Sequence, residues 1–249
     1  MLTAVNDGFV DEKATINTEN GQWNYENQTI HDGMNGGNYK IDDILAHSSN
    51  VGMAKIITKY YENQPEKFYK YLQDWKLSEK LNDGKPNAFS PEIITPKDKN
   101  WSKSTLASAS YGYGLKLNAL QITNFYNAIA NQGKLLKPNF NENQKTEILV
   151  DKIATDRSLQ ILKDALIQSV EKGTPKSNSN KNFKIVGKSG TTRLEYWKSG
   201  QPKYQASFVG FFPAENPKYT IYVAINEPNL VKGYNGAIVA FPVFMEIAE

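Results

Sequence analysis

The 249-residue chain contains no cysteine and only two histidines, and each shortage excludes a class of site. Without cysteine the chain can form no disulfide, no thiolate nucleophile and no cysteine-based metal centre. His31 and His47 lack spaced partners, so we expect His31 in a solvated loop and His47 packing or capping at a helix end. We therefore expect no histidine triad, no metal site and no cofactor.

Strong charge of one sign and long apolar runs are also missing. Lys and Arg number 29 against 26 Asp and Glu, without a long basic run, so we expect no nucleic-acid partner. No stretch approaches the roughly 18 apolar residues that a membrane span needs. The apolar start at residues 1–5 has the character of a helix entered midway, and we interpret Met1 as a truncation point.

Hydrophobic periodicity predicts an α/β chain with most helices first and most strands last. Apolar residues recur at helical spacing in residues 39–61, 120–130 and 153–172. Strand-like patterns and a final helix follow at 183–187, 204–212, 219–225 and 237–248. The short turn at 213–217 predicts antiparallel neighbours. We expect a mainly helical part with a crossover over about 1–182 and a sheet with a helix over about 183–249.

Two short motifs about 140 residues apart carry the chemistry. Ser48-Ser49-Asn50 and Lys188-Ser189-Gly190-Thr191 are two of the three signature elements of serine acyl-transferases that handle β-lactams and D-alanyl peptides. The third element, a nucleophilic Ser-x-x-Lys, should precede Ser48 and is not there. Its one literal match, residues 169–172, comes after Ser48, and we treat it as chance. Because a serine nucleophile needs an adjacent base, we expect no nucleophile in this chain.

Each motif alone is weak evidence, and on spacing alone Ser48 and Asn50 are more simply explained as helix caps. Five blocks in one order are harder to attribute to chance. They are Ser48-Ser49-Asn50-Val51-Gly52, residues 110–115, Gly187-Lys188-Ser189-Gly190-Thr191, residues 206–213 and residues 236–244.

In this order the blocks resemble the transpeptidase domain of class B penicillin-binding proteins over nearly the whole chain. The septal branch, the division-specific peptidoglycan D,D-transpeptidase called penicillin-binding protein 3, is the most similar. The resemblance implies a β-lactamase/transpeptidase-like fold: an antiparallel sheet flanked by helices, joined to an all-helical subdomain, incomplete at the N-terminus. It places the active site where the two parts meet.

The resemblance also implies roles for individual residues. Lys188 would add positive potential and contact Ser48, and Ser48 would relay a proton to the leaving D-alanine. Asn50 would hold the substrate backbone and the catalytic lysine. Ser189 and Thr191 would bind the substrate carboxylate, with the Thr191 amide as an oxyanion donor, while Gly190 would let the strand approach the ligand.

The implied activity is cross-linking of peptidoglycan stem pentapeptides that end in D-Ala-D-Ala, with β-lactams acylating the same serine. We expect the chain by itself to be inactive. The implied location is the periplasmic side of the cytoplasmic membrane, with division-complex membrane proteins as partners through an absent N-terminal part and anchor. A D,D-carboxypeptidase, a β-lactamase-like enzyme, and a non-catalytic scaffold or remnant binding division proteins remain alternatives.

Overall fold

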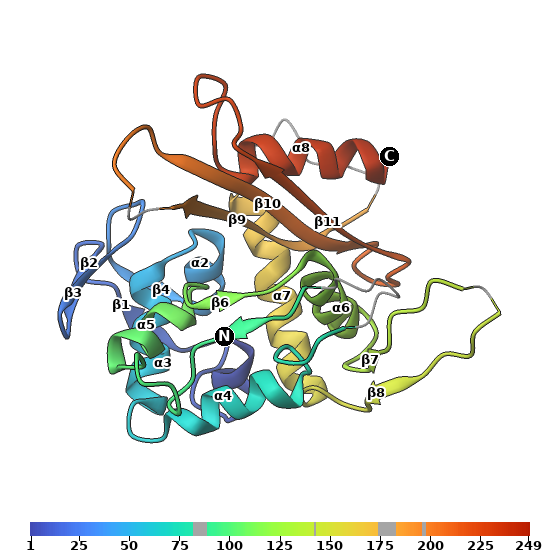
Figure 1. The fold of residues 1–249 in the computed structure, drawn as a ribbon, viewed down its shortest axis with the longest axis horizontal. Helices are drawn as coiled ribbons and strands as arrows, with labels where there is room; N and C mark the ends of the chain where they lie inside the picture. Colours follow the sequence, from blue (N-terminus) through green and yellow to red (C-terminus); the bar gives the residue numbers. More distant parts are fainter. Residues whose placement is uncertain (82–88, 142, 174–182, 196–197) are drawn as a thin grey trace.

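A three-stranded sheet and a group of helices meet along one long helix, α7, in the computed structural model (Figure 1). The structure describes residues 1–81, 89–141, 143–173, 183–195 and 198–249. Helices of the first part are α1 (Leu2–Asn6), α2 (Ile41–Ala46), α3 (Asn50–Tyr61), α4 (Pro65–Asp74), α5 (Lys103–Ser110), α6 (Ala119–Ala130) and α7 (Asp156–Gly173).

Short antiparallel ribbons connect these helices. The paired strands are β1 (Thr15–Asn17) with β4 (Asn38–Lys40), β2 (Gln22–Tyr25) with β3 (Gln28–His31), β5 (Glu92–Ile93) with β6 (Leu115–Lys116), and β7 (Leu135–Leu136) with β8 (Ile148–Val150). Because strands of two to four residues are too short to show an alternating pattern, periodicity gave no sign of them.

The main sheet has the order β11-β10-β9 and is antiparallel throughout. It comprises β9 (Val186–Leu194), β10 (Lys203–Phe212) and β11 (Tyr219–Asn226). The predicted strand at 183–187 was therefore placed too early, since β9 runs through the whole Lys-Ser-Gly-Thr motif. The boundary expected near residue 182 lies outside the described residues.

Both faces of the sheet are covered. Helix α8 (Gly236–Ala248) packs on one face, where the Phe208 ring lies 4.7 Å from the Phe241 ring and 4.8 Å from the Phe244 ring. Helices α6 and α7 lie against the other face, where Phe211 joins the core of the helical part. This arrangement confirms the predicted antiparallel sheet flanked by helices.

Helix α7 connects the two parts because it packs both on α2 and on β9. Its buried face carries Leu159, Leu162 and Leu166, spaced at three and four residues. At its C-terminal end, Lys172 pairs with Asp43 at 2.8 Å and with Asp42 at 3.3 Å. Helix α7 therefore sets the position of α2 relative to the sheet.

None of the helices in the described residues is long and apolar enough to cross a membrane.

Candidate active site

The Ser-Ser-Asn motif forms the sharp turn between α2 and α3. Ser49 is the N-cap of α3, and its buried hydroxyl accepts a hydrogen bond from the Gly52 amide at 2.9 Å. Ser48 precedes it in the left-handed region, with φ of +53°, and its side chain is exposed. Asn50 is the first helical residue. The capping role considered for Ser48 and Asn50 thus falls to Ser49, and the two flanking side chains are left for other contacts.

The end of strand β3 holds this turn from behind. The Asp32 carboxylate accepts hydrogen bonds from the Ser49 hydroxyl at 2.6 Å and from the Val51 amide at 2.9 Å. The carbonyl of His31 accepts one from the Asn50 side-chain amide at 2.9 Å. His31 is the last residue of β3, so the expected loop placement was wrong, but its side chain is exposed and only its backbone takes part. Sequence reasoning missed Asp32, although an acid in a polar turn was a visible signal.

Lys188 reaches the turn from the opposite side. Its ammonium donates to the Ser48 hydroxyl, and also to the Ser189 carbonyl at 3.0 Å. Burial lowers the pKa of Lys188 to about 8. Within the described ranges no Asp or Glu oxygen lies within 4.0 Å of this nitrogen. The ammonium is thus mostly charged at neutral pH and has no acidic partner there, which suits it to attract a ligand carboxylate.

The two hydroxyls that follow Lys188 lie beside it on β9. The Ser189 hydroxyl is 3.5 Å from the Lys188 nitrogen. The exposed Thr191 hydroxyl accepts a hydrogen bond from the Gly236 amide at 3.2 Å, which leaves its own proton available for a ligand. Lys188, Ser48 and Ser189 therefore lie together, and the Thr191 hydroxyl follows two residues further along β9.

Glycines make the approach of α8 to β9 possible. A Cβ atom on Gly236 would lie 2.1 Å from the Ser207 carbonyl oxygen and 2.6 Å from the Gly190 carbonyl oxygen. A Cβ atom on Gly190 would lie 2.7 Å from the Ser207 hydroxyl. The structure shows that Gly190 admits the neighbouring strand β10, whereas its expected approach to a ligand stays a prediction.

The chance Ser-x-x-Lys has a packing role at the α2–α7 contact. The buried Ser169 hydroxyl donates to the Leu45 carbonyl at 3.3 Å, and Lys172 is paired with the acids of α2. Hydrogen bonds to Asp43 and Asp42 outweigh burial and raise the pKa of Lys172, so this lysine is a poor base. Across the described residues, no group of three or more His, Asp or Glu side chains could hold a metal.

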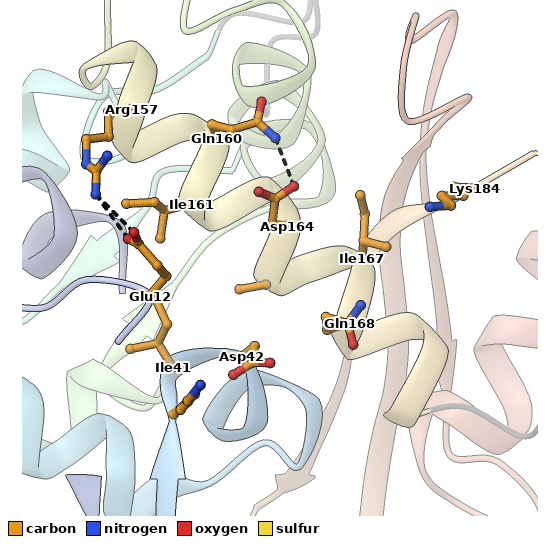
Figure 2. Close-up of a pocket in the computed structure, with 12 residues that line it drawn as sticks. Glu12, Ile41, Asp42, Arg157, Gln160, Ile161, Asp164, Ile167, Gln168 and Lys184 are labelled. Carbon is orange, nitrogen blue, oxygen red and sulfur yellow. Dashed lines mark hydrogen bonds and ion pairs between the residues drawn. The ribbon is translucent and has the colours of Figure 1, made fainter. Parts of the chain in front are cut away.

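An open groove of about 620 Å³ lies apart from these residues, along α7 (Figure 2). Some of its polar side chains pair with each other: Arg157 binds Glu12 at 3.1 Å, and Gln160 donates a hydrogen bond to Asp164 at 2.8 Å. Neither Ser48 nor Lys188 lines it. The motif residues, not this groove, form the candidate site.

Comparison with known families identifies the family of the chain. The sequence matches the family described as "Penicillin binding protein transpeptidase domain" over residues 1–249. The chain belongs to this family. The penicillin-binding transpeptidase fold is also found in the solved transpeptidase domain of Burkholderia pseudomallei penicillin-binding protein 3, which superposes with a TM-score of 0.85 at 27% identity. That alignment covers 99% of this chain and 74% of the other.

Two curated relatives carry related names. A probable peptidoglycan D,D-transpeptidase, PenA, of Neisseria flavescens is 28% identical over 249 residues, covering 99% of this chain and 60% of that protein. A peptidoglycan D,D-transpeptidase FtsI homolog of Mesostigma viride is 26% identical over 275 residues, covering 98% and 45%. The chain thus spans about half the length of these relatives. The predicted family and fold are confirmed.

Proposed function

We propose that this chain is the larger, C-terminal part of a serine D,D-transpeptidase domain that cross-links stem peptides during septal cell-wall synthesis. The observation that carries the proposal is the contact of Lys188 with Ser48, which joins the two motifs across the junction of sheet and helices. The names of the relatives support the same activity.

The proposed substrate is the D-Ala-D-Ala end of a stem pentapeptide. Its terminal carboxylate would bind the hydroxyls of Ser189 and Thr191 within the positive potential of Lys188. The backbone of the peptide would bind Asn50 and the edge of β9, which has one strand neighbour, β10, in the described sheet. Gly190 lies at the centre of this edge.

In the proposed reaction a serine attacks the penultimate D-alanine carbonyl, and the C–N bond to the last D-alanine breaks. The Thr191 amide would stabilise the oxyanion, and Ser48 would pass a proton to the departing amine. Because the Ser48 hydroxyl accepts a hydrogen bond from Lys188, its own proton points away from the ammonium and is available for donation. An amine of a neighbouring stem then takes the acyl group.

The attacking serine must come from outside the 249 residues, because no Ser-x-x-Lys precedes Ser48. We therefore expect no acyl transfer from this chain alone. The catalytic groups would work on the outer side of the cytoplasmic membrane, where the cross-linked substrate lies, with division proteins as partners. The alternative is a non-catalytic scaffold that binds division proteins.

Fluorescent-penicillin labelling on a denaturing gel separates these possibilities. The 249-residue chain is compared with a longer chain that includes an upstream Ser-x-x-Lys, and with the longer chain carrying Ser169→Ala. Labelling of both longer forms, and not of the short chain, supports the proposal. Labelling of neither longer form favours the scaffold, and labelling of the short chain would mean that a different nucleophile operates.

A further inference from the structure

We propose that Asp32 is a positioning residue that holds Ser48 and Asn50 in the geometry the reaction requires. This inference rests on the proposed function, because it concerns the same site. Asp32 lies immediately after β3 and belongs to neither motif.

The carboxylate of Asp32 makes two hydrogen bonds to the residues on either side of Asn50. One oxygen accepts from the Ser49 hydroxyl at 2.6 Å and the other from the Val51 amide at 2.9 Å. Hydrogen bonds to a carboxylate are stronger than hydrogen bonds between neutral groups. The Val51 amide is one of the first N–H groups of α3, which have no partner within their own helix. Asp32 therefore fixes both the cap and the first turn of α3.

Ser49 has no freedom to replace this contact. Its side chain is buried, and its hydroxyl accepts from the Gly52 amide while it donates to Asp32. The space is tight, since a Cβ atom on Gly52 would lie 2.9 Å from Ile44 and 3.0 Å from the Ser49 hydroxyl. Removing the acceptor at Asp32 would leave a buried hydroxyl proton without its partner.

Asp32 is itself anchored to the ribbon that carries it. Its amide donates to the Gly21 carbonyl at 2.8 Å. The preceding Ile30 is buried in a cluster with Val51 and Ala54 of α3. Between them, His31 holds the Asn50 side chain through its carbonyl. The β2–β3 ribbon thus acts as a rigid support for the turn.

The geometry of Ser48 shows why such support is needed. A φ of +53° is a conformation that residues other than glycine rarely adopt, so neighbouring contacts must maintain it. The adjacent residue, Ser49, is the one that Asp32 holds. If that bond is lost, the turn can relax, and the Ser48 hydroxyl moves away from Lys188.

The test uses the longer chain with its Ser-x-x-Lys and the variant Asp32→Asn, which keeps the shape and the acceptor for Val51 but cannot also accept the Ser49 proton. We expect the first-order acylation rate constant for penicillin to fall about 10- to 100-fold, from the loss of one hydrogen bond to a charged group. The dissociation constant of the non-covalent complex with penicillin, which forms before acylation, should change less than the acylation rate constant. Ser49→Ala should cause a similar fall, and the double variant should be no slower than either single variant.

Asp98→Asn is the matched control, because Asp98 also accepts from one amide and one hydroxyl, both of Thr95, within its own exposed loop. It should leave the rate constant unchanged. A merely structural role of Asp32 would lower the fraction of protein that labels while leaving the rate constant of that fraction intact. An unchanged rate constant in Asp32→Asn would overturn the inference.

Failure of the proposed function is seen separately, as absence of labelling in the unsubstituted longer chain. In that case crystal structures of the 249-residue chain with and without Asp32→Asn decide the inference. Loss of the contact between Ser48 and Lys188 in the variant would support a positioning role, and its persistence would contradict that role.

Discussion

Replacing Gly236 with alanine should push α8 away from the sheet. The new methyl group would lie 2.1 Å from the Ser207 carbonyl oxygen and 2.6 Å from the Gly190 carbonyl oxygen. Both are backbone atoms, so no side-chain rotation can relieve the overlap. Overpacking of this kind costs about 1–3 kcal/mol, and we expect the upper end. Alanine is more favourable than glycine in a helix by at most about 1 kcal/mol, so the net loss in the free energy of unfolding is about 2 kcal/mol.

For a chain of this length, a loss of about 2 kcal/mol lowers the melting temperature by about 4–8 °C. Differential scanning calorimetry of the 249-residue chain measures this shift. The control is Gly33→Ala, since a Cβ atom there meets nothing within 4 Å and the backbone is not left-handed. That change should be neutral or stabilise by about 0.4–1 kcal/mol. Equal melting temperatures for the two variants would refute the close approach of α8 to β9.

Two further predictions concern pH. A lysine in the unfolded chain has a pKa of about 10.4, whereas burial lowers the pKa of Lys188 in the folded chain to about 8. Between pH 8 and about 10.4 the unfolded chain therefore binds more protons than the folded chain, so the free energy of unfolding rises with pH. The Lys188→Met variant should therefore have a higher melting temperature than the parent at pH 7, and the difference should shrink between pH 8 and about 10.4. A difference in melting temperature that does not change with pH would contradict the lowered pKa. Burial alone would raise the pKa of Asp7, but hydrogen bonds from Tyr71 and Tyr61 and the charge of Lys67 hold it below its usual value. Asp7→Asn should cost about 1–3 kcal/mol at pH 7, and this deficit should vanish as the pH falls well below about 3.9; a deficit that persists in acid would assign the loss to shape instead of charge.

Hydrophobic periodicity in the sequence was sufficient to predict the longer helices and strands. The apolar spacing of residues 120–130 predicted α6, and a capping box between Asn118 and Gln121 fixes its start one residue earlier. Residues 204–212 and 219–225 similarly predicted β10 and β11 to within one residue at each end. These segments bury whole faces, so their sequences carry a strong signal.

The support of the site could not be predicted in the same way. Ser-Ser-Asn offers three cap residues, and the path of the chain from α2, not the motif, makes Ser49 the cap and leaves Ser48 and Asn50 flanking it. The partner of Ser49, Asp32, is 17 residues away at the end of a four-residue strand. Contacts that depend on how separate elements pack leave no periodic trace in a sequence.

Helix α7 packs between α2 and β9 and therefore sets the distance between these two elements. Ser48 follows α2 and Lys188 lies on β9, so the width of this helix determines how far apart their polar atoms stand. A bulkier residue on its buried face at Ser169, whose hydroxyl donates to the Leu45 carbonyl of α2, would change that separation without touching any ligand. Under the proposed function, we expect such interior substitutions to change the rate of acylation by β-lactams.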